Sequence, residues 1–230
     1  MEDRDVSELG RASGIPLVAY SRNHVDQCVQ RVLVRTGEPE ARSLARLIRR
    51  DPHARSRFRR SLLAPVTRMF RDPAEFDLLD AAALPCMTSR GRVSVWSAGC
   101  ATGEELRTVA GLLDAHGVLE GSRLIGTDVL EEALAGARTE WAPLARRAIV
   151  SFEHRDLILD PPPTGKFDLV LCRNVAIYFE PSAQRALHRK LVSVLRPRAF
   201  LMLGSSEQLL RPETLGLEPV GRHIYRRSAG

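Results

Sequence analysis

Apolar residues recur at helical spacing through the first third of the chain. In residues 25–34 and again in 40–50 they lie three or four positions apart, which places them on one face of a helix. Asp51-Pro52 interrupts the second run, and a third helix is predicted over residues 54–69. A fourth is predicted to begin at Asp72-Pro73, because Asp caps helices and Pro suits their first turn. Residues 17–88 are therefore predicted to be helical.

The pattern changes after Arg92, where short apolar strands begin to alternate with amphipathic helices. Strands are predicted at residues 93–97, 123–128, 167–172 and 200–204, and helices at 105–113, 131–138 and 182–195. This alternation is typical of an α/β fold with a mostly parallel, doubly wound sheet. We therefore predict a helical N-terminal domain with its linker helix over residues 1–88 and an α/β domain over 89–230.

Composition narrows the protein class only slightly. Hydrophobic residues make up 44% and charged residues 27%, as in ordinary globular proteins. No apolar run approaches the roughly 20 residues that cross a bilayer, and the acidic start is unlike a signal peptide, so we expect a cytoplasmic protein without membrane insertion. The four cysteines form no CxxC pair and the histidines lack ligand spacing, so no metal site is expected.

The net charge of +6 is weak evidence for a polyanionic partner. Of the 34 basic residues only Lys166 and Lys190 are lysines, which leaves 34 − 2 = 32 arginines, a skew that genome base composition also produces. No RNA-binding signature or zinc finger accompanies the charge, and no nucleic-acid partner is expected.

The loop after the first predicted strand is the first candidate for chemistry. In Ser97-Ala-Gly-Cys-Ala-Thr-Gly103, the glycines Gly99 and Gly103 let a ligand approach the backbone closely. Asp128 ends the next strand, where a carboxylate can accept both hydroxyls of a ribose. Such strand ends occur in dinucleotide-binding and in methyltransferase folds alike.

Two acidic residues favour the second of these folds. The loop has GxxxG followed by Glu104 and Glu105, whereas a pyrophosphate site needs GxGxxG and no carboxylates at the helix start. Carboxylates there suit the cationic sulfonium or ammonium of S-adenosylmethionine. Simple helix capping by both glutamates explains the loop equally well, so the loop alone leaves both interpretations open.

Longer motifs resemble one family. Residues 167–179, FDLVLCRNVAIYF, resemble the FDxxxCRNVxIYF signature of the CheR family, and residues 69–76, MFRDPAEF, resemble its FFRDPxxF segment. Residues 97–105 are similar to its SAGCSTGEE loop, and Gly204-Ser-Ser-Glu207 to its GHSE motif. The resemblance runs in order from about residue 12 to residue 225. CheR proteins are chemotaxis methyltransferases that esterify glutamates on chemoreceptor helices.

The resemblance implies a Rossmann-like class I methyltransferase sheet, S-adenosylmethionine as cofactor and S-adenosylhomocysteine as product. It also implies roles for individual positions. Arg71 and Tyr178 match the residues that flank the reacting methyl. The positions that match cofactor contacts are Thr67, Arg71, Gly99, Gly103, Glu104, Asp128, Asp156, Leu157, Arg173 and Asn174.

Three departures from the family pattern stand out. Asp156 replaces the usual Asn before Leu157, which exchanges an amide donor for an acceptor, and Pro65 stands where some members have Asn. The family's small antiparallel β-subdomain has no room, because only residues 139–155 separate the preceding helix from Asp156. We therefore expect no tether to a receptor-tail peptide.

The functional expectation is a protein-glutamate O-methyltransferase acting on an acidic helical partner such as a chemoreceptor cytoplasmic domain. The basic segment 46–60 suits such a partner, although a solvated helix face has the same composition. The alternatives are a methyltransferase of the same fold for another protein or a small carboxylic acid, and a non-catalytic scaffold or sensor that binds S-adenosylmethionine.

Overall fold

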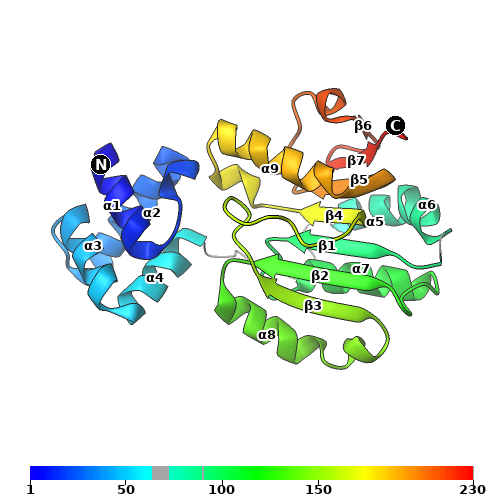
Figure 1. Ribbon diagram of the computed structural model, residues 1–230, viewed down its shortest axis with the longest axis horizontal. Helices are drawn as coiled ribbons and strands as arrows, with labels where there is room; N and C mark the ends of the chain where they lie inside the picture. The colour runs from blue at the N-terminus through cyan, green and yellow to red at the C-terminus, as the bar shows by residue number, and fades with distance from the viewer. Residues whose placement is uncertain (64–72, 90, 230) are drawn as a thin grey trace. The chain divides into compact units, whose positions relative to one another are not determined.

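The computed structural model describes residues 1–63, 73–89 and 91–229 (Figure 1). The chain divides into two compact units. The first comprises residues 1–66 together with 178–185, and the second comprises residues 67–177 together with 186–230. This division differs from the sequence-based boundary at residue 88, for a reason given below.

The first unit is a bundle of short helices. Its elements are α1 (Asp3–Ser13), the 3₁₀ turn η1 (Leu17–Ala19), α2 (Arg22–Thr36), α3 (Ala41–Arg50) and α4 (Pro52–Leu63). Apolar side chains of all four α-helices, among them Leu9, Val25, Leu44 and Phe58, are fully buried. Helices α2, α3 and α4 correspond to predicted helices, but α1 was missed, because its buried side chains are few: Val6, Leu9, Ala12 and Ser13.

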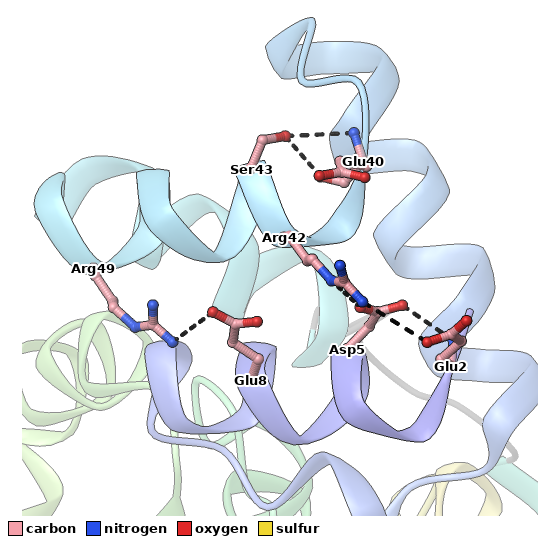
Figure 2. Close-up of polar contacts among 7 residues, drawn as sticks. All are labelled: Glu2, Asp5, Glu8, Glu40, Arg42, Ser43 and Arg49. Carbon is pink, nitrogen blue, oxygen red and sulfur yellow. Dashed lines mark hydrogen bonds and ion pairs between the residues drawn. The ribbon is translucent and has the colours of Figure 1, made fainter.

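Ion pairs line the surface between α1 and α3 (Figure 2). Arg42 contacts Asp5 at 3.3 Å and Glu2 at 3.8 Å, and Arg49 contacts Glu8 at 3.1 Å. Both arginine side chains are about half exposed, so each pair contributes at most about 1 kcal/mol. Their consequence is electrostatic, since part of the basic charge of α3 is compensated within the unit.

Residues 178–185 join the first unit although they lie far along the chain. Tyr20 and Phe179 form an isolated antiparallel β-bridge, and their rings meet edge to face at 4.8 Å. The amide of Ser21 donates to the Tyr178 carbonyl oxygen at 2.8 Å, and the amide of Glu180 donates to the Ala19 carbonyl oxygen at 2.9 Å. The turn that bears Tyr178 is thus fixed against the start of α2.

The second unit is built on a seven-stranded sheet in the order β3-β2-β1-β4-β5-β7-β6. The strands are β1 (Ser94–Ala98), β2 (Arg123–Asp128), β3 (Ile149–His154), β4 (Phe167–Cys172), β5 (Leu195–Leu203), β6 (Leu217–Pro219) and β7 (Ile224–Arg227). The first five run parallel, and β7 pairs antiparallel with β5 and β6. Every residue of β1 and β4 is buried, as expected for a parallel sheet covered on both faces. The mostly parallel, doubly wound sheet predicted from the sequence is confirmed.

The helices of this unit are α5 (Pro73–Ala82), α6 (Leu84–Thr88), α7 (Glu104–Ala115), α8 (Glu131–Trp141) and α9 (Pro181–Ser193). The start of α9, residues 181–185, clusters with the first unit. Short 3₁₀ turns are η2 (Leu144–Arg146), η3 (Ala176–Tyr178) and η4 (Pro212–Leu215). Phe76, Leu79, Leu84 and Met87 belong to the same buried cluster as the sheet residues. This packing explains why α5 and α6 group with the sheet and not with the helical unit.

The connection between α8 and β3 is short. It consists of residues 142–148, which contain the turn η2 and no strand. The small antiparallel β-subdomain is therefore absent here, as predicted. In the described part of the chain, no helix combines the length and apolarity that a bilayer crossing requires.

Candidate active site

The candidate site lies where the strand order reverses. Strand β1 has β2 on one side and β4 on the other, and all three run parallel. The carboxyl ends of these strands therefore meet at one edge of the sheet, the usual ligand position in such folds. The loop after β1, Asp128 at the end of β2 and Arg173-Asn174 after β4 all lie at this edge.

The loop after β1 is shaped by glycines that no other residue can replace without strain. Gly99 and Gly103 have φ values of 79° and 87°, in the left-handed region. A Cβ on Gly99 would lie 2.5 Å from Val175 Cγ2, and one on Gly103 would lie 2.8 Å from Trp141 Nε1. The glycines thus keep the backbone of this loop close to its neighbours.

Asp128 holds this loop against β2. Its Oδ2 accepts the amide of Ala101 at 2.8 Å, and its Oδ1 accepts the amide of Leu130 at 2.9 Å. Burial raises the pKa of Asp128, and these backbone donors oppose the rise. Each carboxylate oxygen keeps a second lone pair, so the residue can still accept hydroxyl groups.

Two glutamates begin α7, whose N-cap is Gly103. Glu104 accepts a hydrogen bond from the Thr102 hydroxyl. Glu105 forms an ion pair with Arg173 at 3.1 Å, and the Arg173 side chain is 1% exposed. The same guanidinium lies 5.0 Å from the ring centre of Phe76. Arg173 therefore has a buried, charge-balanced setting that the sequence analysis did not predict.

Burial raises the pKa of Glu105 to about 7, despite the opposing effect of Arg173, and the nearby Glu207 carboxylate adds to the rise. A carboxyl group with a pKa so close to neutrality changes charge near physiological pH. The charge of Glu105 therefore depends on the charged groups beside it, Arg173 and Glu207.

Glu207 organises the loop after β4. Its Oε1 accepts the amides of Val175, Ala176 and Ile177 at 3.0, 2.7 and 3.3 Å. Its Oε2 accepts the amides of Asn174 and Gly204, both at 2.8 Å. One buried carboxylate therefore fixes four consecutive residues, including Asn174 with its left-handed φ of 57°. The Gly204–Glu207 motif is part of the resemblance described above, but no role for Glu207 was predicted from it.

The loop after β3 is anchored by a lysine. Lys190 Nζ donates to the carbonyl oxygens of Leu157, Ile158 and Asp160, at 2.6, 3.2 and 2.7 Å. An ammonium has three donors that can diverge in this way, whereas a guanidinium is planar. Lysine is rare in this chain, so a lysine at position 190 was a sequence feature from which a specific role could have been predicted.

Asp156 has a local structural role at this loop. Its Oδ1 accepts the amides of Ile158 and Leu159 at 2.7 and 3.2 Å, and its own amide donates to Asp160. These two bonds need an oxygen acceptor, which the Asp156 carboxylate supplies as an Asn side chain would. The replacement of Asn by Asp is therefore compatible with this loop. Leu157, which follows, is buried.

The structure does not place the remaining candidate residues at the strand edge. Thr67 and Arg71, like Pro65, lie outside the described residues. Tyr178 belongs to the first unit, where its ring centroid lies 4.7 Å from that of His24. The strand edge therefore brings together Gly99, Gly103, Glu104, Asp128, Arg173 and Asn174, and the assignments of Arg71 and Tyr178 remain predictions.

Comparison with known proteins identifies this arrangement. The family described as "CheR methyltransferase, SAM binding domain" matches residues 65–146 and 144–221. The chain belongs to the CheR family. A chemotaxis protein methyltransferase of Klebsiella aerogenes is 31% identical over 240 residues, which cover 89% of this chain and 82% of that protein.

Two further proteins are similar to this chain over different shares of their own length. An uncharacterised 104.1 kDa protein of Rhodobacter capsulatus is 31% identical over 243 residues, which cover 90% of this chain and only 25% of the relative. The chain thus spans about a quarter of that protein's length. The magnesium protoporphyrin IX methyltransferase of Synechocystis, solved with bound S-adenosylmethionine, is 17% identical with a TM-score of 0.47 over 67% of this chain and 81% of the other.

The two CheR segments meet at residues 144–146, in the short connection between α8 and β3. The break in the family match and the missing β-subdomain therefore fall at the same place. This chain is a CheR domain without that insertion.

S-adenosylmethionine is the cofactor of this CheR domain, and the residues at the strand edge suit it. A carboxylate at Glu104 can attract a cation, and Asp128 keeps acceptor lone pairs that hydroxyl groups can use. The buried hydroxyl of Ser97 has no partner among the described residues, so a polar atom is left at the end of β1. Gly99 and Gly103 give the loop its left-handed turns at this edge.

Proposed function

We propose that this CheR protein transfers a methyl group from S-adenosylmethionine to glutamate side-chain carboxylates on chemoreceptor cytoplasmic helices, producing glutamyl methyl esters. Membership of the CheR family carries the proposal. The arrangement of Asp128, Glu104 and the Glu207-held loop at one sheet edge supports it.

The main task of the protein in this reaction is to align the carboxylate with the methyl group. When bound, S-adenosylmethionine supplies a methyl carbon whose bond to sulfur breaks as a carboxylate oxygen attacks, leaving S-adenosylhomocysteine. An ionised carboxylate is already a nucleophile, so no side chain has to remove a proton. Holding the reactants in line can lower the barrier by several kcal/mol, up to roughly 7–11 in the best models.

We assign the alignment to two residues. Arg71 pairs with the incoming carboxylate, because a guanidinium can bind both oxygens of a carboxylate in one plane. Tyr178 orients the acceptor beside the methyl. We assign positioning of the cofactor to the other residues that match cofactor contacts of the family: Thr67, Gly99, Gly103, Glu104, Asp128, Asp156, Leu157, Arg173 and Asn174.

The missing β-subdomain bears on acceptor choice. Without it, recruitment through a receptor-tail peptide is not expected, and the acceptor helix has to be recognised directly. The same absence is compatible with another protein, or a small carboxylic acid, as acceptor. A cytoplasmic location follows from a receptor substrate.

The test is a transfer assay with methyl-labelled S-adenosylmethionine and a purified chemoreceptor cytoplasmic fragment. Label that is released as methanol by mild base supports glutamyl esterification. A matched fragment with its acceptor glutamates changed to glutamine should take up no label. Base-stable label would exclude esterification, and cofactor binding without any transfer would favour a scaffold or sensor.

A further inference from the structure

His24 lies where three segments of the first unit meet. It is the third residue of α2, and its amide donates to the Ser21 hydroxyl at 3.3 Å. Its Nε2 lies 2.9 Å from the carbonyl oxygen of Leu62, in the last turn of α4. Because a carbonyl oxygen only accepts, Nε2 carries the proton of this hydrogen bond. The imidazole is thus fixed at one edge.

The face of the same ring meets Tyr178. Their centroids are 4.7 Å apart and the ring planes are tilted by 38°, within the range of favourable aromatic pairs. Backbone bonds from Ser21 and to Ala19 fix the main chain of this turn but do not set the orientation of the tyrosine side chain. Among the described residues no hydrogen bond involves the Tyr178 hydroxyl, so the ring contact with His24 is a direct restraint on the orientation of this side chain.

We propose that His24 is a positioning residue for methyl transfer, which sets the orientation of the Tyr178 ring. The inference rests on the proposed function, in which Tyr178 orients the acceptor. Through the Leu62 bond, His24 also ties this ring to the last turn of α4, the helix that precedes Arg71 in the chain. One imidazole therefore connects the Tyr178 ring to the end of α4.

A purely structural role for His24 has a different signature. The ring also lies near Cys28 Sγ, at 3.8 Å, and near the ring of Tyr20, at 6.3 Å between centroids, so its removal will cost some stability. A general loss of stability would lower activity equally whether or not residue 178 carries a hydroxyl. A positioning role would lower activity only when the hydroxyl is present.

The first experiment needs no acceptor. The chain has three tyrosines, so protein labelled with 3-fluorotyrosine gives three ¹⁹F resonances, which Tyr→Phe variants assign. His24→Ala should shift and broaden the Tyr178 line, while that of Tyr225, whose hydroxyl is hydrogen-bonded to the Leu209 amide in the second unit, stays unchanged. An unmoved Tyr178 line would overturn the proposal whatever the acceptor proves to be.

The second experiment is a double-mutant cycle in the transfer assay described above. His24→Ala should lower kcat about tenfold, with the Kd for S-adenosylhomocysteine changed less than twofold. In the Tyr178→Phe background the same substitution should change kcat less than twofold. Equal effects in both backgrounds would show a structural role only and would overturn the proposal.

Matched variants separate the ring from the hydrogen bond. His24→Phe keeps an aromatic face and should retain at least half of kcat, whereas His24→Gln should behave like His24→Ala. The reverse order would contradict positioning by the ring. His53→Ala removes an exposed imidazole from α4 and should leave kcat unchanged. If His24→Ala fails to fold, His24→Leu replaces it in both experiments. Failure of the proposed function would appear separately, as an inactive wild type with an intact ¹⁹F response.

Discussion

Glu105 and Arg173 form an ion pair of 3.1 Å that connects the first turn of α7 to the end of β4, and the arginine is almost fully buried. Even with this partner, burial and the neighbouring Glu207 carboxylate leave the pKa of Glu105 at about 7, well above the usual value of 4.5. The pair therefore makes stability depend on pH.

The sign of this dependence follows from proton uptake. Between about pH 4.5 and pH 7 the folded protein keeps a proton on Glu105 that the unfolded chain has lost, so the contribution of this group to stability falls as pH rises. We expect Glu105→Gln to remove roughly 1–3 kcal/mol of this pH dependence. Urea unfolding of both proteins at pH 5 and pH 8 measures it, and parallel pH profiles would contradict the assignment.

A second prediction concerns Glu207. Glu207→Gln leaves one oxygen in place of two and turns an amide toward backbone donors, so the free energy of unfolding should fall by about 2–4 kcal/mol. Turnover should fall more than tenfold, because residues 174–177 lose their anchor. Glu213→Gln, an exposed glutamate in η4, is the control and should match the wild type in both measurements. Unchanged stability in Glu207→Gln would sink this account.

The glycines of the β1 loop give a third prediction with an internal control. Gly103→Ala places a Cβ 2.8 Å from Trp141 Nε1 at a φ of 87°, which should cost about 1–3 kcal/mol of stability. It should also weaken binding of S-adenosylhomocysteine, measured by calorimetry, about tenfold. Gly111→Ala, within α7 and with open space around it, should instead stabilise the protein by about 0.5–1 kcal/mol. Equal binding in both variants would argue against the loop as the cofactor contact.

A fourth prediction tests the residues assigned to the reacting methyl. Arg71→Ala and Tyr178→Phe should both cut turnover by at least tenfold, since each removes a group that aligns the acceptor. The Kd for S-adenosylmethionine should change less in Tyr178→Phe than in Arg71→Ala, which also matches a cofactor contact. Full activity in both variants would refute the assignment.

The basic surface of α4 gives the last prediction. Arg42 and Arg49 of α3 are already paired with carboxylates of α1, so the exposed Arg55 and Arg60 of α4 are better candidates for an acidic acceptor helix. Arg55→Glu with Arg60→Glu should raise the KM for a chemoreceptor fragment several-fold, more at low salt than at high salt, and leave cofactor binding unchanged. Arg211→Glu, at an exposed arginine of the second unit, is the control for charge reversal away from α4. An unaltered KM would reject docking on this face.

Periodicity predicted the elements whose apolar pattern is strong. Residues 123–128 and 167–172 coincide with β2 and β4, because both strands are bounded by polar turns. The antiparallel β6 and β7 were missed, since they are only three and four residues long and half exposed. The helix predicted over residues 182–195 does end nearby, as α9 at Ser193. The chain then continues as β5 through Pro197, with Arg198 at a φ of 63°.

Spacing and motif placed Gly99, Gly103 and Asp128 at one sheet edge, because parallel strands end on the same side. The partners that fix this edge could not be predicted. Glu207 lies 33 residues from Asn174, and Lys190 lies 33 from Leu157, so only the folded chain brings them together. A separation of 33 residues corresponds to no helical or strand spacing.

The first unit is discontinuous in sequence, since residues 178–185 belong to it although strands β1 to β4 of the second unit precede them in the chain. A gene fragment that ends at residue 66 would omit Phe179 and Glu180, which bond to Tyr20 and Ala19. The helical region therefore cannot be exchanged between proteins by a single crossover without losing part of its own fold. Recombination that keeps the unit intact has to retain residues 178–185 as well, so the N-terminal helices and the turn that bears Tyr178 are inherited together.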